Sequence, residues 1–111
     1  MMLVLEKDDG RLMTFPSGNE AEGYCELIDV ENGEYEFCDD EGQISMHAVT
    51  RRLSFFALFS SKDYILAPVG TPDIQNALRL IGSARCFDDK GCGLGSIDEL
   101  KAHVLRRKGA L

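Results

Sequence analysis

The sequence predicts one α+β domain over residues 1–111, in which a mainly antiparallel sheet of five to six strands packs against three helices. A chain of 111 residues has the length of a single domain. Its hydrophobic content of 44% and charged content of 28%, with only 3 prolines, are typical of a folded globular protein. Short segments in which polar and apolar residues alternate predict most of the strands, and three segments with helical spacing predict the helices.

A β-hairpin is expected at the start of the chain. Residues 3–5 and 11–15 are strand-like runs, and the turn residues Asp8, Asp9 and Gly10 lie between them. The second strand should end at Pro16, because proline has no amide to donate to a sheet.

A helix is then expected to begin at Gly18 and to end at Gly33. Ser17 and Glu20 have the spacing of a capping box, in which the serine hydroxyl accepts a hydrogen bond from the glutamate amide. Four apolar residues follow at helical spacing and would face the core: Ala21, Tyr24, Cys25 and Ile28. Three acids would face solvent: Glu22, Glu26 and Asp29. A strand over residues 24–30 is the alternative, and it is disfavoured because it would place Asp29 on one face with Cys25 and Leu27.

A second hairpin is expected from the alternation in residues 34–38 and 43–48. A four-residue loop over residues 39–42 would pair Phe37 with Ile44 and keep the large apolar side chains on one face. A three-residue loop would pair Cys38 with Ile44 and divide these side chains between the two faces, so we expect the four-residue loop. The outer face would then carry Glu34, Glu36, Cys38, Gln43, Ser45 and His47.

The second half of the chain is expected to supply two or three strands and two helices. Residues 53–59, the most apolar stretch, predict a central strand, and residues 64–67 predict another that ends at Pro68. A helix should follow with Thr71 as its N-cap and Gly82 at its end. Its buried stripe would contain Ile74, Ala77, Leu78 and Ile81. Residues 84–87 predict a short strand, and a capping box at residues 96–99 predicts a last helix that ends near Arg107.

The charge of the chain is unevenly distributed. The net charge is −7, but residues 6–42 contain 13 carboxylates and two cations, a net charge of −11, whereas the other 74 residues carry +4. No lysine or arginine lies between Arg11 and Arg51. Such a segment repels phosphates and attracts basic surfaces. We therefore expect no direct binding of nucleic acid, since affinity for its backbone comes from lysine and arginine.

The remaining composition indicates a cytoplasmic protein without cofactors. No apolar run approaches the roughly 20 residues that span a bilayer, so no membrane association is expected. The four cysteines are expected to be free thiols, because nothing in the sequence directs export. Cys86, Cys92 and His103 could approach one another, but they lack the close spacing and the fourth ligand of a zinc site. No metal or other cofactor is expected.

No motif in the sequence identifies a reaction. The loop from Gly91 to Gly95 precedes a helix, but its glycine spacing differs from known phosphate-binding loops and acidic residues surround it. Cys38 and His47 would share a face of the second hairpin at a separation too large for a nucleophile and its base. We assign no catalytic residue and favour a binding protein over an enzyme.

Residues 26–42, with the sequence ELIDVENGEYEFCDDEG, resemble a segment of small bacterial proteins, some of which are similar to the immunity proteins of toxin systems. The resemblance implies a helix, a strand and an acidic turn in this order, and it carries no functional residues.

The charge pattern predicts a non-enzymatic protein whose acidic surface docks on a basic protein partner, such as a toxin. Its expected contacts are eight carboxylates: Glu22, Glu26, Asp29, Glu34, Glu36, Asp39, Asp40 and Glu41. The alternative is a small-molecule-binding or enzyme-like domain that uses a cavity beneath the loop from Gly91 to Gly95. A third hypothesis is an accessory subunit of an oligomer, and the oligomeric state stays open.

Overall fold

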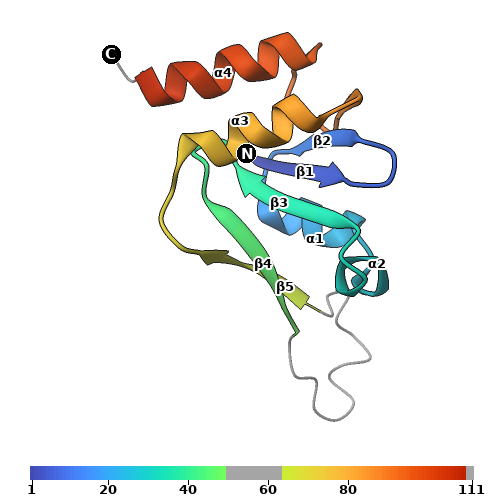
Figure 1. The fold of residues 1–111 in the computed structure, drawn as a ribbon. Helices are drawn as coiled ribbons and strands as arrows, with labels where there is room; N and C mark the ends of the chain where they lie inside the picture. The colour runs from blue at the N-terminus through green and yellow to red at the C-terminus, as the bar shows by residue number, and fades with distance from the viewer. Residues whose placement is uncertain (50–63, 110–111) are drawn as a thin grey trace.

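The computed structural model describes residues 1–49 and 64–109 and confirms the predicted α+β class. Six strands form one sheet in the order β5-β4-β3-β1-β2-β6, and every neighbouring pair is antiparallel except β2 and β6 (Figure 1). The strands are β1 (Met2–Glu6), β2 (Arg11–Phe15), β3 (Tyr35–Asp39), β4 (Ile44–Val49), β5 (Tyr64–Val69) and β6 (Cys86–Asp89). The strand expected over residues 53–59 lies outside the described residues.

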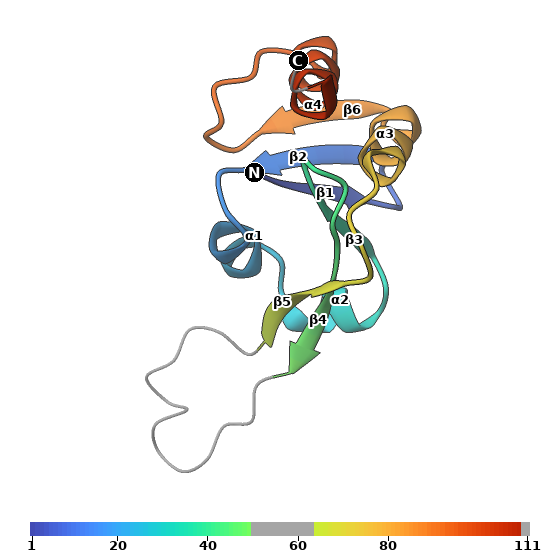
Figure 2. The ribbon, with the colours of Figure 1, turned by 90° about the vertical axis from the view of Figure 1, so that its left-hand side faces the viewer.

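Helices cover both faces of the sheet. They are α1 (Gly18–Tyr24), α2 (Leu27–Glu31), α3 (Ile74–Ser83) and α4 (Ile97–Gly109), and Figure 2 shows α1 and α3 on opposite sides of the strands. One apolar cluster joins the sheet to α1 and α2: Val4, Met13, Phe15, Ala21, Val30, Phe37 and Tyr64. The other joins it to α3 and α4: Leu3, Leu5, Leu12, Cys38, Ala77, Leu80, Leu100 and Val104. The central strands are therefore buried on both sides.

Local sequence signals place several elements correctly. The first hairpin has the expected strands, and the Ser17 hydroxyl accepts a hydrogen bond from the Glu20 amide at 3.4 Å. At the other end of the chain, the Ser96 hydroxyl accepts one from the Glu99 amide at 3.2 Å. The short strand expected over residues 84–87 is present two residues later, as β6. These capping bonds and turns depend on neighbouring residues alone.

The single helix expected from Gly18 to Gly33 is wrong. Two helices, α1 and α2, are separated by Cys25 and Glu26, whose backbones are extended. The Tyr64 hydroxyl donates hydrogen bonds to the carbonyls of Cys25 at 2.6 Å and Glu22 at 3.2 Å. A continuous helix would use these carbonyls for its own amides, so the contact with β5 ends α1. Ile28, expected in the core, is consequently 64% exposed.

The expected register of the second hairpin is wrong by one residue. Phe37 pairs with Ser45 and Cys38 pairs with Ile44, which leaves a three-residue loop. The Asp39 carboxylate selects this loop by accepting hydrogen bonds from the amides of Glu41 and Gln43 at 2.9 and 2.8 Å. Dividing the apolar side chains between two faces costs little here, because helices cover both faces and both Phe37 and Cys38 are buried.

The start of α3 also differs from the expectation. Its N-cap is Asp73, whose carboxylate accepts a hydrogen bond from the Gln75 amide at 3.0 Å, and not Thr71. The Gly42 carbonyl of the β3–β4 loop accepts from the Asp73 amide and from the Asn76 side chain, at 3.2 and 3.0 Å. The loop therefore helps to set where α3 begins. Leu80, absent from the expected stripe, is 1% exposed in the core, and Gly82 lies inside α3.

The contact between Gly42 and α3 predicts a strong effect of Gly42→Ala. Gly42 has φ of +89°, and an added Cβ would overlap the backbone of Asp73. Strain and overlap together should lower the free energy of unfolding by about 2 to 5 kcal/mol, measured by urea denaturation. Gly33→Ala is the matched control, because Gly33 has φ of +73° and no described atom within 4 Å of an added Cβ. Equal effects of the two substitutions would contradict this role for Gly42.

Candidate functional site

The eight carboxylates expected at the partner surface do not share one environment. Glu22 is wrong as a surface contact, because it is buried and its carboxylate accepts a hydrogen bond from the Leu66 amide of β5 at 2.7 Å. Glu22 lies in α1, and because α1 ends at Tyr24, its side chain faces β5 and not solvent. Asp39 is half-buried, and its carboxylate holds the β3–β4 loop.

Three further carboxylates have cationic partners within the chain. Glu36 pairs with Arg79 at 3.0 Å, Glu41 with Arg107 at 2.6 Å, and Asp40 with Arg107 at 3.3 Å. The partners come from α3 and α4, which are distant in sequence. Although no lysine or arginine lies near these three acids in the sequence, the fold supplies cationic partners for them.

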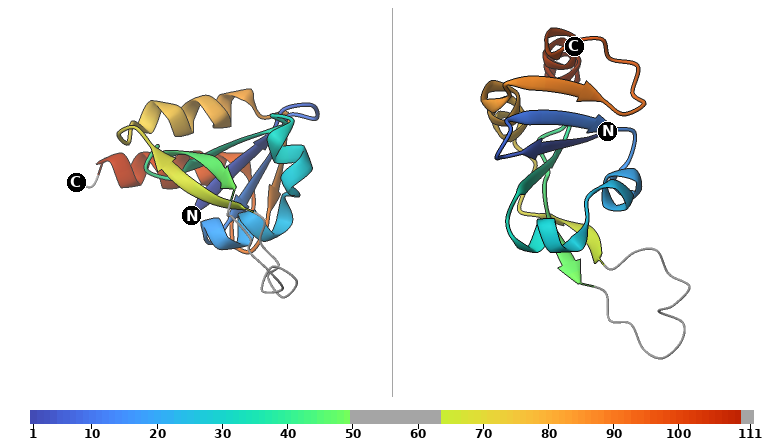
Figure 3. Two further views of the ribbon diagram at one scale, coloured as in Figure 1. Left: turned by 90° about the horizontal axis from the view of Figure 1, so that it is seen from below. Right: turned by 90° about the vertical axis from the view of Figure 1, so that its right-hand side faces the viewer.

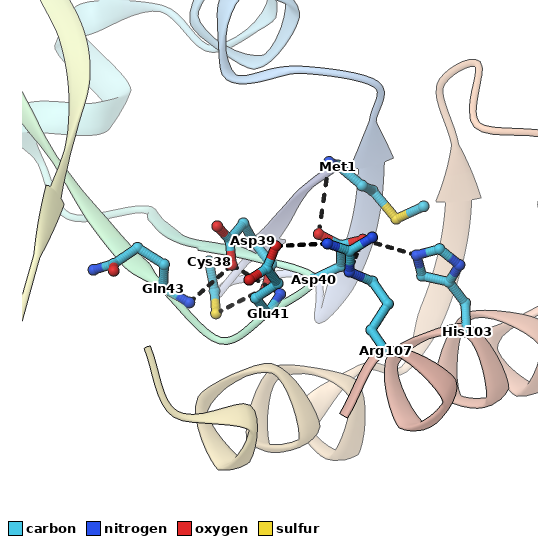
Figure 4. A network of polar contacts seen from close by, with 8 residues as sticks. All are labelled: Met1, Cys38, Asp39, Asp40, Glu41, Gln43, His103 and Arg107. Carbon is cyan, nitrogen blue, oxygen red and sulfur yellow. Dashed lines mark hydrogen bonds and ion pairs between the residues drawn. The ribbon is translucent and has the colours of Figure 1, made fainter. Parts of the chain in front are cut away.

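Asp40 is the centre of a buried charge network. Its side chain is 8% exposed and lies 2.8 Å from His103 Nε2, 3.3 Å from Arg107 Nε and 3.7 Å from the Met1 amino group (Figure 4). The Asp40 amide also donates to the Met1 carbonyl at 3.2 Å. This network joins the first residue, the β3–β4 loop and α4, so Asp40 has a structural environment and is not available as a surface contact.

The remaining carboxylates gather on and beside α2. We define the α2 acidic face by five residues: Glu26, Ile28, Asp29, Glu31 and Glu34. Among residues 1–49 and 64–109, none of its carboxylates forms an ion pair with a lysine or arginine. Figure 3 shows α2 beside β4 and β5, at the end of the molecule away from α4. The α2 acidic face therefore lies at one end of the described part of the molecule.

Carboxylates of the α2 acidic face lie close enough to affect one another's ionisation. The pKa of Glu34 is raised above its ordinary value, by loss of solvent and by the negative charges of Asp29 and Asp8. Glu26 and Glu31 are exposed, and with Leu27 and Ile28 they line a shallow hollow that extends toward Tyr64. Glu31 was missed as a contact because an uninterrupted helix does not place it beside Glu22, Glu26 and Asp29.

A cavity of about 330 Å³ lies where β4 separates from β3. Side chains from both faces of β3 line it, including Tyr35, Glu36 and Phe37. Ile44 and Met46 of β4 form the opposite wall, and Glu31 of the α2 acidic face lies at its rim. Met46 belongs to the large apolar side chains of the second hairpin, and it is 57% exposed. The cavity is a gap within the sheet and adjoins the acidic surface.

Amides of the loop from Gly91 to Gly95 already bind a carboxylate of the protein, that of Asp89. The Asp89 carboxylate accepts hydrogen bonds from the Thr14 hydroxyl at 2.6 Å and from the amides of Cys92 and Gly93 at 3.1 and 2.9 Å. Burial alone would raise the pKa of Asp89, but these hydrogen bonds outweigh it and lower the pKa below the usual value. The amides that could bind a phosphate are therefore occupied by the protein's own carboxylate.

The cysteines lie in separate environments. Cys25 and Cys38 are buried on opposite faces of the sheet, and burial raises the pKa of each thiol to about 12. Both are thus protonated at neutral pH and are poor nucleophiles. Cys86 is exposed and Cys92 is half-buried. In the part of the chain that the structure describes, no three side chains of His, Cys, Asp or Glu are grouped to hold a metal ion.

Comparison with protein-family models, curated proteins and solved structures finds no match to this chain. None of the described helices is long and apolar enough to cross a membrane. The candidate site therefore depends on geometry and charge alone.

The Asp40 network predicts a large difference between two adjacent acids. Asp40→Asn should lower the free energy of unfolding by about 2 kcal/mol, because it removes a buried charge that contacts the Met1 amino group, the Arg107 guanidinium and the His103 imidazole. Glu41→Gln should have a much smaller effect, because the Glu41 side chain is 58% exposed and exposed ion pairs contribute little. Urea denaturation at pH 7 measures both, and an equal loss would contradict a central role for Asp40.

The Asp89 hydrogen bonds predict a dependence of stability on pH. A carboxyl whose pKa is lower in the folded state contributes stability above its unfolded pKa of about 3.9 and loses it as the pH falls through the folded value. Asp89→Asn should therefore destabilise the fold at pH 7, by about 1 to 3 kcal/mol, and the difference from wild type should shrink below about pH 4. Urea denaturation at several pH values measures this. A difference that stays constant from pH 7 to pH 3 would contradict the assignment.

Proposed function

We propose that this chain is a non-enzymatic binding protein that docks on a basic protein partner through the α2 acidic face. The observation that carries the proposal is a group of four carboxylates on and beside α2, where the side chain of Ile28 is also exposed, with no lysine or arginine paired to these carboxylates in the described residues. Carboxylates elsewhere on the second hairpin already have internal partners, which makes this group distinct.

The chemistry of the α2 acidic face defines the partner that fits it. An exposed apolar side chain beside carboxylates matches a partner surface in which lysines and arginines lie beside an apolar contact. Opposite potentials would accelerate the encounter, and the central apolar contact would slow dissociation. Nucleic acid does not fit, because its phosphates would be repelled.

A toxin is one partner of this class. Residues 26–42, which resemble a segment of small bacterial proteins, some of them similar to immunity proteins of toxin systems, contain the whole α2 acidic face. An immunity protein can act by covering the basic surface with which a toxin binds nucleic acid, and this would take place in the cytosol. The small-molecule alternative at Gly91 to Gly95 is less favoured, because Asp89 occupies two of the amides of that loop.

Neutralising the α2 acidic face should abolish capture of the partner. Wild type and the triple variant Glu26→Gln, Asp29→Asn, Glu31→Gln would be immobilised and exposed to a cytosolic extract of the source organism at low salt. We expect wild type to retain a basic protein that the triple variant retains at least about tenfold less, because each charged contact contributes roughly 1 kcal/mol. Quantitative mass spectrometry of the retained proteins measures the ratio, and salt should release the partner.

A control variant separates local charge from net charge. Asp9→Asn, Glu20→Gln, Asp98→Asn changes the net charge by the same amount at exposed positions outside the α2 acidic face. It should retain the partner as wild type does. Retention of the same basic proteins by wild type and the triple variant, or equal loss in both variants, would refute docking through α2.

A further inference from the structure

Strand β4 is paired along its full length on one side only. On the β5 side, all six residues from Ile44 to Val49 have partners, whereas on the β3 side only Ile44 and Ser45 do. Figure 1 shows β4 leaving β3 at an angle from this point. Backbone groups in an antiparallel sheet point alternately to either side, and Ser45 lies opposite Phe37. The N–H and C=O groups of His47 and Val49 therefore point into the gap.

Contacts of the folded chain keep this gap open. β5 is held against α1 by the Tyr64 hydroxyl, which donates to the Cys25 carbonyl at 2.6 Å, and by Glu22, which accepts from the Leu66 amide at 2.7 Å. β4 follows β5, while β3 stays paired with β1. The outer edge of β5 is blocked, because Glu22 binds the Leu66 amide and Pro68 has no amide. Among residues 1–49 and 64–109, the open edge of this part of the sheet is thus the β4 edge that faces β3.

The surroundings of the gap are suited to an extended segment with alternating side chains. One face of the β4–β5 ribbon is wholly apolar: Ile44, Met46, Ala48, Ile65, Ala67 and Val69. Met46 is 57% exposed and Ile65 and Val69 are each 45% exposed. This face continues the side of the sheet that α3 covers farther along, and Figure 2 shows β4 and β5 extending away from α3 and α4. A strand added to β4 would extend this apolar face with every second side chain.

The charge around the gap indicates which kind of segment enters it. Glu31 lies at the rim, next to the other carboxylates of the α2 acidic face, and the Arg79 and Glu36 side chains at the rim neutralise each other at 3.0 Å. Lys7 also lines the gap, so the charges of Glu31 and Lys7 balance there, and the excess of carboxylates lies beside the gap, on α2. The potential at the α2 side therefore favours lysine or arginine beside the apolar residues.

We infer that an extended segment of a partner protein, with alternating apolar residues and flanking lysines or arginines, adds to the open edge of β4 in the gap between β3 and β4. Main-chain hydrogen bonds to His47 and Val49 would supply affinity that depends little on sequence, and the apolar face and Glu31 would supply selectivity. The basic character of the segment rests on the proposed function, whereas its pairing with β4 rests on the strand geometry alone.

The test compares loss of a backbone donor with loss of a side chain. Peptides of twelve random residues displayed on phage would be selected on the wild-type chain, and the best peptide would be synthesised as the probe. His47→Pro removes the amide that points into the gap without removing a hydrogen bond to β5, and His47→Ala is its matched control. Dissociation constants would be measured by isothermal calorimetry. We expect selected peptides to alternate and to carry lysine or arginine, with affinity at least about tenfold lower for His47→Pro and within about twofold for His47→Ala.

Hydrogen exchange followed by NMR gives a second readout that needs no variant. The amides of His47 and Val49 should exchange quickly in the free chain and at least about tenfold more slowly with saturating peptide, because an added strand protects them. Failure to select any peptide, equal binding to His47→Pro, or unchanged exchange at both amides would overturn strand addition. Protection of both amides in the free chain at high protein concentration would indicate that a second copy of the chain pairs with β4. This result would also overturn the addition of a partner segment.

The triple variant of α2 distinguishes this inference from the proposed function. If the triple variant binds the peptide and retains the basic proteins as wild type does, while His47→Pro binds the peptide weakly, strand addition stands and the charge proposal fails. If the triple variant loses capture of the basic partner while the exchange of both amides is unaffected by peptide, the charge proposal stands and strand addition fails.

Discussion

The hydroxyl of Tyr64 holds the first residue of β5 to the end of α1, and the shape of the candidate surface depends on this contact. It occupies the carbonyls of Glu22 and Cys25, which ends the helix and lets α2 begin as a separate element. As a result Ile28 points to solvent and Glu22 turns inward to bind the Leu66 amide. The same contact draws β5, and β4 with it, away from β3. The exposed apolar residue, the acidic rim and the gap in the sheet thus have one physical origin.

Charge compensation divides the acidic segment into two parts. At one end of β3, Asp40 and Glu41 are neutralised by Arg107 of α4, and Asp40 is also close to His103 and the Met1 amino group. At the other end, the α2 acidic face has no such partners in the described residues. The fold therefore neutralises part of the acidic segment, and the carboxylates without a described cationic partner occupy a smaller area than the segment itself. The candidate binding surface is therefore the α2 acidic face, and not the whole acidic segment of the sequence.

Sequence reasoning was most successful where neighbouring residues decide the outcome. The first hairpin, the capping bonds of Ser17 and Ser96 and the α+β class follow from spacing within a few residues. The break after α1 depends on Tyr64, which lies 39 residues beyond Cys25, and Arg107 lies 66 residues beyond Glu41. The residues that neighbour Tyr64 and Arg107 in the sequence do not indicate either of these two long-range contacts. The register error has a related cause, because the rule of one apolar face does not apply to a strand that helices cover on both sides.

The two candidate modes of recognition, charge on the α2 acidic face and strand addition to β4, contribute differently to binding. Charge on the α2 acidic face acts over about 8 Å at physiological salt, so it can select basic partners before contact but contributes less once salt screens it. The open edge of β4 acts only at hydrogen-bond distance and binds the main chain, which every partner has. Either mode alone is weak or unselective. Because Glu31 lies at the rim of the gap and on the acidic face, one short basic segment can engage both modes, and an acidic or neutral strand can engage only one. Selectivity then follows from the adjacency of two simple surfaces and needs no specialised pocket.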